Sequence, residues 1–88
     1  MLRNLADLGY DRRDIGAAVR QQRLARSLTQ AEVAWNAGIT QAALSNYENG
    51  KRDIPIPALI SICRALGTYP VAVVPGLAPP PGEGTESL

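Results

Sequence analysis

Two amide side chains, Gln41 and Asn46, lie five positions apart in a short run of small and polar residues. An amide can donate one hydrogen bond and accept another, which matches the N6 and N7 positions of adenine in the DNA major groove. Ala42, between them, leaves room for a thymine methyl group, and Ser45 can bond to a base or to a phosphate. Contact with DNA is therefore predicted if one helix presents these side chains together.

The preceding residues predict two short helices joined by a tight turn. Thr29 can cap a helix that begins at Gln30, and the carboxylate of Glu32 can reach back to the cap amide. Gly38 is the residue best able to adopt the left-handed conformation that ends a helix, and Thr40 can cap the next one. The second helix therefore carries Gln41 to Asn46.

That second helix has two distinct sides. Leu44 and Tyr47 are three positions apart, so they face the core while the polar residues face outward. Two short helices joined by a glycine turn have the arrangement of a helix-turn-helix DNA reader.

Two further helices flank this pair. Asp11 can cap a helix over residues 12–26, and Pro55 can begin another that ends near Leu66. Ser27 follows the first of them, where the chain either adopts a left-handed conformation that costs about 1 kcal/mol or ends the helix without one.

The segment from Ile15 to Gly67 resembles the Cro and phage-repressor type, or XRE, helix-turn-helix family. The residues that carry the resemblance at fixed spacing are Ile15, Val19, Arg23, Leu28, Thr29, Gln30, Val33, Ala34, Gly38, Ile39, Thr40, Leu44, Ser45, Glu48, Asn49, Gly50, Pro55, Leu59, Ile62, Leu66 and Gly67. The resemblance implies an all-α domain of four to five compactly packed helices. Ser27 departs from the family pattern, which usually has glycine there.

The resemblance also implies a DNA-binding site. Its residues are Gln30, Thr40, Gln41, Ala42, Ser45, Asn46, Lys51 and Arg52. Gln41 and Asn46 are expected to read bases, whereas Gln30 and Lys51 are expected to contact the phosphate backbone. Arg52 either joins Lys51 at the phosphates or pairs with Asp53.

The family match places Arg23 opposite Glu48, where it implies a structural ion pair between the first helix and the end of the recognition helix. Loss of one partner of a buried pair can cost about 3 to 5 kcal/mol. Trp35 occupies a position that is normally polar, and two interpretations remain open for it: packing on Leu5 and Leu8, or contact with a partner protein.

Residues 69–75 are rich in β-branched residues and bounded by prolines, which favours one short strand. The chain has no second strand-like run, so we expect this strand to pair with its copy in a homodimer. The interface would consist of Val71, Ala72, Val73 and Val74.

Composition sets the broad class. A chain of 88 residues with 45% hydrophobic residues is one domain with a modest core. The absence of His, of paired carboxylates and of a glycine-rich phosphate loop argues against an enzyme, a metal or a cofactor. Cys63 is the only cysteine, and no secretory leader or membrane span is visible, so the cytoplasm, in association with bacterial or phage nucleoid, is the expected location.

Four parts are expected along the chain. They are an extension over residues 1–11, the helix-turn-helix domain over 12–67, the dimerisation strand over 68–76 and a disordered tail over 77–88. Leu2, Leu5 and Leu8 recur at a spacing of three, which fits either a short amphipathic turn or a frayed end.

The leading functional hypothesis is a homodimeric repressor that occupies an inverted repeat in double-stranded DNA and blocks transcription. The alternative is a protein-interaction module that binds and neutralises a toxin. A helix-turn-helix domain followed by one strand and a loose tail is similar to the HipB-type antitoxins, partners of HipA-type kinase toxins. Under that resemblance both functions coexist.

Overall fold

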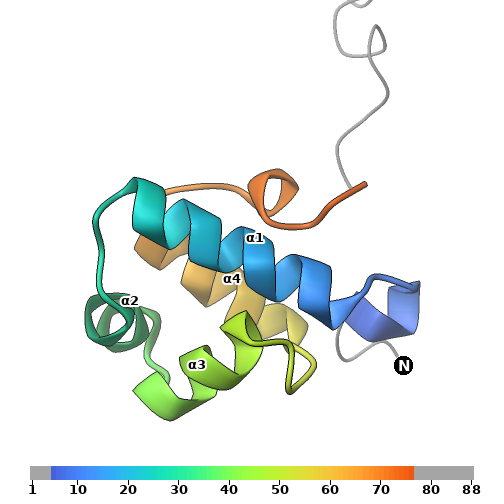
Figure 1. Cartoon of the computed structure of the whole chain (residues 1–88), viewed down its shortest axis with the longest axis horizontal. Helices are drawn as coiled ribbons and strands as arrows, with labels where there is room; N and C mark the ends of the chain where they lie inside the picture. Colours follow the sequence, from blue (N-terminus) through green and yellow to red (C-terminus); the bar gives the residue numbers. More distant parts are fainter. Residues whose placement is uncertain (1–4, 77–88) are drawn as a thin grey trace, which may run out of the picture.

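The computed structural model describes residues 5–76, and this part of the chain is helical (Figure 1). Its elements are the 3-10 helix η1 (Leu5–Leu8), the α-helices α1 (Arg12–Ala25), α2 (Gln30–Ala37), α3 (Gln41–Glu48) and α4 (Ile56–Leu66), and the 3-10 helix η2 (Pro70–Ala72). The expected all-helical class is confirmed, with four α-helices over the described range. None of these helices is long and apolar enough to cross a membrane.

Side-chain caps begin the first three α-helices at the predicted residues. Asp11 accepts a hydrogen bond from the first turn of α1. Thr29 Oγ1 accepts from the backbone N–H of Glu32, and the Thr29 N–H donates to Glu32 Oε1, each at 3.0 Å. This reciprocal pair holds the pKa of Glu32 below its usual value. Thr40 Oγ1 accepts from the N–H of Ala43 at 3.0 Å and so begins α3.

Left-handed residues follow several of the helices, and two of them, Gly38 and Ser27, test predictions made from the sequence. Gly38 ends α2 with a φ of 71°, as predicted for a glycine at that position. Ser27 lies after α1 with a φ of 56°, so the strained alternative is the correct one. The N–H of the next residue, Leu28, donates to the carbonyl of Arg23 at 3.1 Å, and the N–H of Arg26 donates to the same carbonyl, so this helix end is closed by backbone hydrogen bonds.

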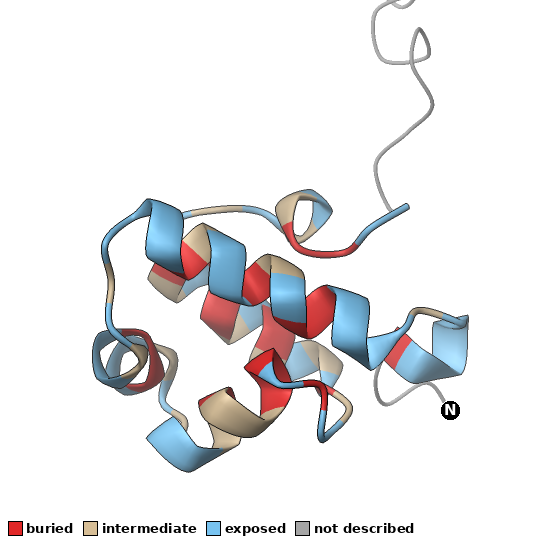
Figure 2. Ribbon diagram, in the orientation of Figure 1, coloured by how far each residue is buried: buried red, intermediate tan, exposed pale blue. Residues whose placement is uncertain are grey.

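The helices surround a single core, and their apolar faces are turned inward (Figure 2). α1 packs against α3, while α2 packs against both α3 and α4. The buried apolar residues are Leu5, Ile15, Val19, Val33, Ala34, Leu44, Tyr47, Ile54, Leu59, Ile62, Cys63, Leu66, Val73 and Val74. α1 and α2 therefore hold α3 from its inner side, and α4 supports α2 from behind.

Gly16 allows α1 to approach the end of α3 closely. A Cβ at this position would lie 2.1 Å from the carbonyl oxygen of Tyr47 and 2.9 Å from that of Glu48. Both obstacles are backbone atoms at the end of α3, which cannot move without shifting that helix. Glycine is therefore required here by packing, since its backbone is ordinary helix.

The C-terminal segment corrects one prediction. Residues 70–72 form a 3-10 turn, and the N–H groups of Val73 and Val74 both donate to the carbonyl of Pro70. Val73 and Val74 are 0% and 1% exposed, in the core of the same chain. The predicted strand is therefore wrong: proline sets a turn, the turn satisfies the backbone locally, and the valines fill the core. Val71 and Ala72 remain at least partly exposed.

The N-terminal leucines were expected to form either a short amphipathic turn or a frayed end, and the described residues form the turn. Leu5 is buried, and Gly9 ends η1 with a φ of 88°. Leu2 and the tail over residues 77–88, for which a turn and disorder were expected, lie outside the described residues.

Candidate nucleic-acid interface

The residues of α3 that were predicted to contact bases lie away from the core. Leu44 and Tyr47 are buried beneath the helix, as predicted. Gln41 and Ala42 are exposed in its first turn, and the next two members of the set, Ser45 and Asn46, are half-buried. The helix thus presents amide, methyl and hydroxyl groups to one surface, a combination that can bond to the edges of bases.

The turn between α2 and α3 fixes the direction of that surface. Gly38 redirects the chain, and Ile39 Nα donates to the carbonyl of Ala34 at 3.0 Å. Thr40 then begins α3, with its hydroxyl oxygen occupied by the helix cap and its side chain exposed. The hydroxyl proton of Thr40 is therefore available to an acceptor outside the chain.

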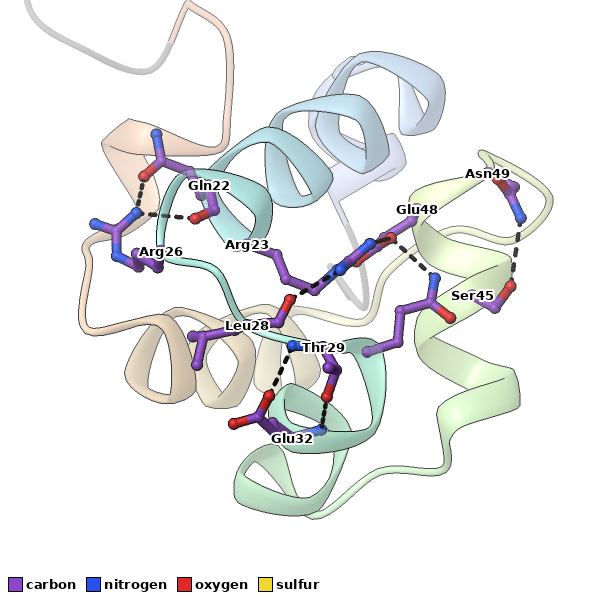
Figure 3. A network of polar contacts seen from close by, with 10 residues as sticks. Gln22, Arg23, Arg26, Leu28, Thr29, Glu32, Ser45, Glu48 and Asn49 are labelled. Carbon is purple, nitrogen blue, oxygen red and sulfur yellow. Dashed lines mark hydrogen bonds and ion pairs between the residues drawn. The ribbon is translucent and has the colours of Figure 1, made fainter.

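A buried ion pair joins α1 to the end of α3 (Figure 3). Arg23 Nε donates to Glu48 Oε2 at 2.7 Å and Arg23 Nη2 donates to Glu48 Oε1 at 3.0 Å, so the contact is bidentate. The two side chains are 10% and 1% exposed. Hydrogen bonding to Glu48 raises the pKa of Arg23 above its usual value. Arg23 Nη1 also donates to the carbonyl of Leu28 at 2.9 Å, which ties the loop before α2 to the same group.

Gln30 adds a third helix to this network. Its Nε2 donates to Glu48 Oε1 at 3.0 Å, so that α2 is linked to the end of α3 as well (Figure 3). Phosphate contact by Gln30 stays a prediction. The residue is half-buried, and one N–H of its Nε2 is directed to Glu48, so only the second N–H of that amide could donate to a phosphate. The sequence did not predict the bond to Glu48, since neither local spacing nor the family resemblance had placed Gln30 beside that residue.

The loop after α3 carries the two cations expected at phosphate. Lys51 and Arg52 are exposed, and neither makes an ion pair within residues 5–76. Asp53 lies beside Arg12 instead, with 4.0 Å between Oδ1 and Nη1. The alternative pairing of Arg52 with Asp53 is therefore absent, and both cations are available to an anion.

Trp35 lies on the outside of α2 and is 86% exposed. Packing on Leu5 and Leu8 is therefore wrong for this residue, because an indole in contact with them would have lost much of that exposure. Leu5 is buried in the core, while Leu8 is itself about half exposed.

Metal-ligating side chains and the single cysteine are two further kinds of chemical group in the described residues. No cluster of three or more His, Cys, Asp or Glu side chains that could hold a metal ion occurs there. Cys63 is buried in the core, and burial raises the pKa of its thiol.

The fold and the exposed side of α3 define a helix-turn-helix protein of the XRE type. Residues 14–75 match the family model described as a helix-turn-helix domain, and the chain belongs to that family. A Bacillus subtilis protein described as the uncharacterised HTH-type transcriptional regulator RghRB is 42% identical over 55 residues. The match spans 62% of this chain but only 40% of that relative's length.

Solved structures have the same fold. The clp gene regulator ClgR from Corynebacterium glutamicum matches with a TM-score of 0.64 and 33% identity, over 66% of this chain and 75% of that one. The restriction-modification controller protein C.AhdI from Aeromonas hydrophila matches with a TM-score of 0.69 over 72% and 96% of the two chains. At 24% identity, this second similarity shows the fold alone.

Proposed function

We propose that the chain is a sequence-specific DNA-binding regulator of transcription in which α3 enters the major groove. The observation that carries the proposal is the exposed polar face of α3, held from behind by the network of Arg23, Glu48 and Gln30. A rigidly positioned helix with amide side chains suits base recognition. Membership of the helix-turn-helix family and the printed description of RghRB as a transcriptional regulator support it.

The residues divide by the chemistry they offer. Gln41 and Asn46 each present an amide that matches adenine, and Ala42 presents a methyl group to thymine. Thr40 and Ser45 carry hydroxyl groups that can bond to a base edge or a phosphate. Base contacts give specificity in this scheme.

Lys51, Arg52 and Gln30 would hold the backbone. Lys51 and Arg52 are exposed cations, and they attract phosphates over a distance that shortens as the salt concentration rises. The amide of Gln30 lies at the start of α2. These contacts fix the register of α3 in the groove without reading sequence.

The regulator proposed here is a homodimeric repressor bound to an inverted repeat, where it excludes other proteins from a promoter. Ile60 on α4 and Val71 in η2 are apolar and about half exposed, and they offer a surface for a second copy. Val73 and Val74 cannot serve as first expected, because they lie in the core. The resemblance to the antitoxins depended mainly on a strand after α4. The chain forms a 3-10 turn there, so we favour the repressor.

A selection of DNA sites from random duplexes tests the proposal. The chain should enrich a defined sequence and should prefer it over a scrambled duplex in competition at physiological salt. Gln41→Ala and Asn46→Ala should each reduce discrimination at one or two base positions by about 5- to 150-fold, which corresponds to about 1 to 3 kcal/mol.

Gln21→Ala is the matched control, because Gln21 is an exposed amide on α1 rather than on α3. It should leave the base preferences unchanged. Equal binding of the native chain to selected and scrambled duplexes would refute the proposal.

A further inference from the structure

The loop after α3 touches the beginning of α1. Gly50, the second residue after α3, lies against Arg13 so closely that a Cβ on Gly50 would be 3.0 Å from Arg13 Cα and 2.6 Å from Arg13 Cγ. Gly50 has a φ of 69°, which brings the chain back toward α1. The Asp53 carboxylate, three residues further on, lies beside the guanidinium of Arg12. Two segments far apart in sequence thus share one surface.

That surface continues from the recognition helix. Figure 1 shows the loop between the C-terminal end of α3 and the N-terminal end of α1. The contacts of Gly50 with Arg13 and of Asp53 with Arg12 establish the same proximity. An anionic rod that lies along α3 and the loop would therefore meet the first turn of α1 next.

Four cations occupy this surface, and each is exposed: Arg12, Arg13, Lys51 and Arg52. These cations differ in how closely a carboxylate of the chain is paired with them. Lys51 and Arg52 make no ion pair within the described chain. Arg12 is paired with Asp53, but the two charged groups are as far apart as 4.0 Å and half of the Arg12 side chain is exposed. Exposed pairs of this kind contribute little and exchange readily for another anion.

Arg13 forms a shorter ion pair, with Asp11. Its Nη2 donates to Asp11 Oδ2 at 3.2 Å, and the same carboxylate caps α1. Asp14, one residue further along α1, adds a third carboxylate near the cations. The side chain of Arg13 is nevertheless 78% exposed, so its guanidinium can bind a second anion without leaving the first.

We infer that Arg12 and Arg13 form, with the loop after α3, a second phosphate-contact surface for the DNA duplex that α3 reads. This inference rests on the proposed function, and it extends the site beyond the residues that the family resemblance implies. Asp53 then acts as a built-in competitor, since it holds Arg12 in the absence of DNA and repels phosphate. The occupant is the sugar-phosphate backbone, because the surface is continuous with the face of α3.

Salt dependence of DNA binding is the decisive measurement. Arg12→Gln and Arg13→Gln keep the methylene groups that pack nearby but remove the charge. Each should reduce the slope of log K against log salt by about 0.9, so that the loss of affinity between 50 and 200 mM KCl becomes about 3.5-fold smaller. Selected and scrambled duplexes should be affected alike, because phosphate contacts carry no sequence information.

Two more variants make the test specific. Asp53→Asn should act in the opposite direction and strengthen binding to both duplexes, since it removes the competing carboxylate. Arg64→Gln is the matched control, because Arg64 is an exposed arginine in the last turn of α4 rather than at this surface. It should preserve the native slope.

The outcomes separate the two claims. If the native chain does not prefer the selected duplex, the proposed function fails. If that preference is present but Arg12→Gln and Arg13→Gln, both shown to be folded by circular dichroism, keep the native slope and affinity, the inference is overturned. A reduced slope in either variant, with Arg64→Gln unchanged, supports it.

Discussion

At the scale of single residues, Glu48 has the most consequential environment. Its carboxylate is almost fully buried and accepts hydrogen bonds from Arg23 on α1 and Gln30 on α2. Burial of a carboxylate without these donors would be unfavourable, because water no longer solvates the charge. The residue therefore holds three helices in one relation, and the position of the recognition helix depends on it.

Glu48→Ala should lower the free energy of unfolding by about 3 to 5 kcal/mol, because it leaves the guanidinium of Arg23 buried without its partner. Urea denaturation followed by circular dichroism measures this. Asp14→Ala removes an exposed carboxylate from the first turn of α1 and should cost less than about 1 kcal/mol. Similar losses in the two variants would contradict a structural role for the pair.

Sequence reasoning succeeded at residues whose role follows from local spacing or from the family pattern. The caps Asp11, Thr29 and Thr40 act on backbone groups within the next three residues, so the sequence nearby suffices to predict them. The need for glycine at position 16 was missed, because its cause lies on a distant helix. Only the packed fold brings Gly16 against the backbone at the end of α3.

At the scale of elements, the segment after α4 shows how the core can override local propensity. β-branched residues at positions 71, 73 and 74 favoured a strand. The 3-10 turn is stable instead because Val73 and Val74 bury their side chains in the core, beside α4. Local propensity is a weak term when two side chains gain full burial, worth about 1.5 to 3 kcal/mol each.

Val73→Ala should therefore destabilise the folded chain by about 2 kcal/mol, through lost burial and the small cavity that remains. Val71→Ala, with an exposed side chain in the same turn, should change stability by less than about 0.5 kcal/mol. Thermal unfolding at several protein concentrations measures both. If Val71→Ala proved the more destabilising variant at low protein concentration, where no second copy is bound, the core position of Val73 would be contradicted. A loss in Val71→Ala that grows as the protein concentration rises would instead place Val71 at the surface proposed for a second copy.

At the scale of the whole molecule, the proposed function lets one α3 read only a short stretch of groove, so high specificity would require two copies on the same DNA. A two-fold dimer places its recognition helices in successive major grooves, about 34 Å apart along one face of the duplex. The described surface offers apolar groups for such pairing at Ile60 and Val71. The half-sites of the operator should then be inverted copies of each other.

Insertion of five base pairs between the two selected half-sites should abolish the preference for the paired site, because half a helical turn moves one half-site to the opposite face. Insertion of ten base pairs returns that half-site to the original face of the duplex. It should recover part of the affinity only if the dimer can span the added helical turn. Gel-shift titration compares the three duplexes. Unchanged affinity after the five-base-pair insertion would show that each chain binds DNA alone.

The exposure of Trp35 also determines how the protein can be observed. Trp35 is the only tryptophan of the chain, and its indole is 86% exposed in the folded state. Its fluorescence emission should therefore resemble that of indole in water before and after unfolding, which makes it a poor reporter of folding. Iodide should quench it freely in the isolated protein. Protection from iodide on addition of another macromolecule would consequently report that the outer face of α2 has become covered.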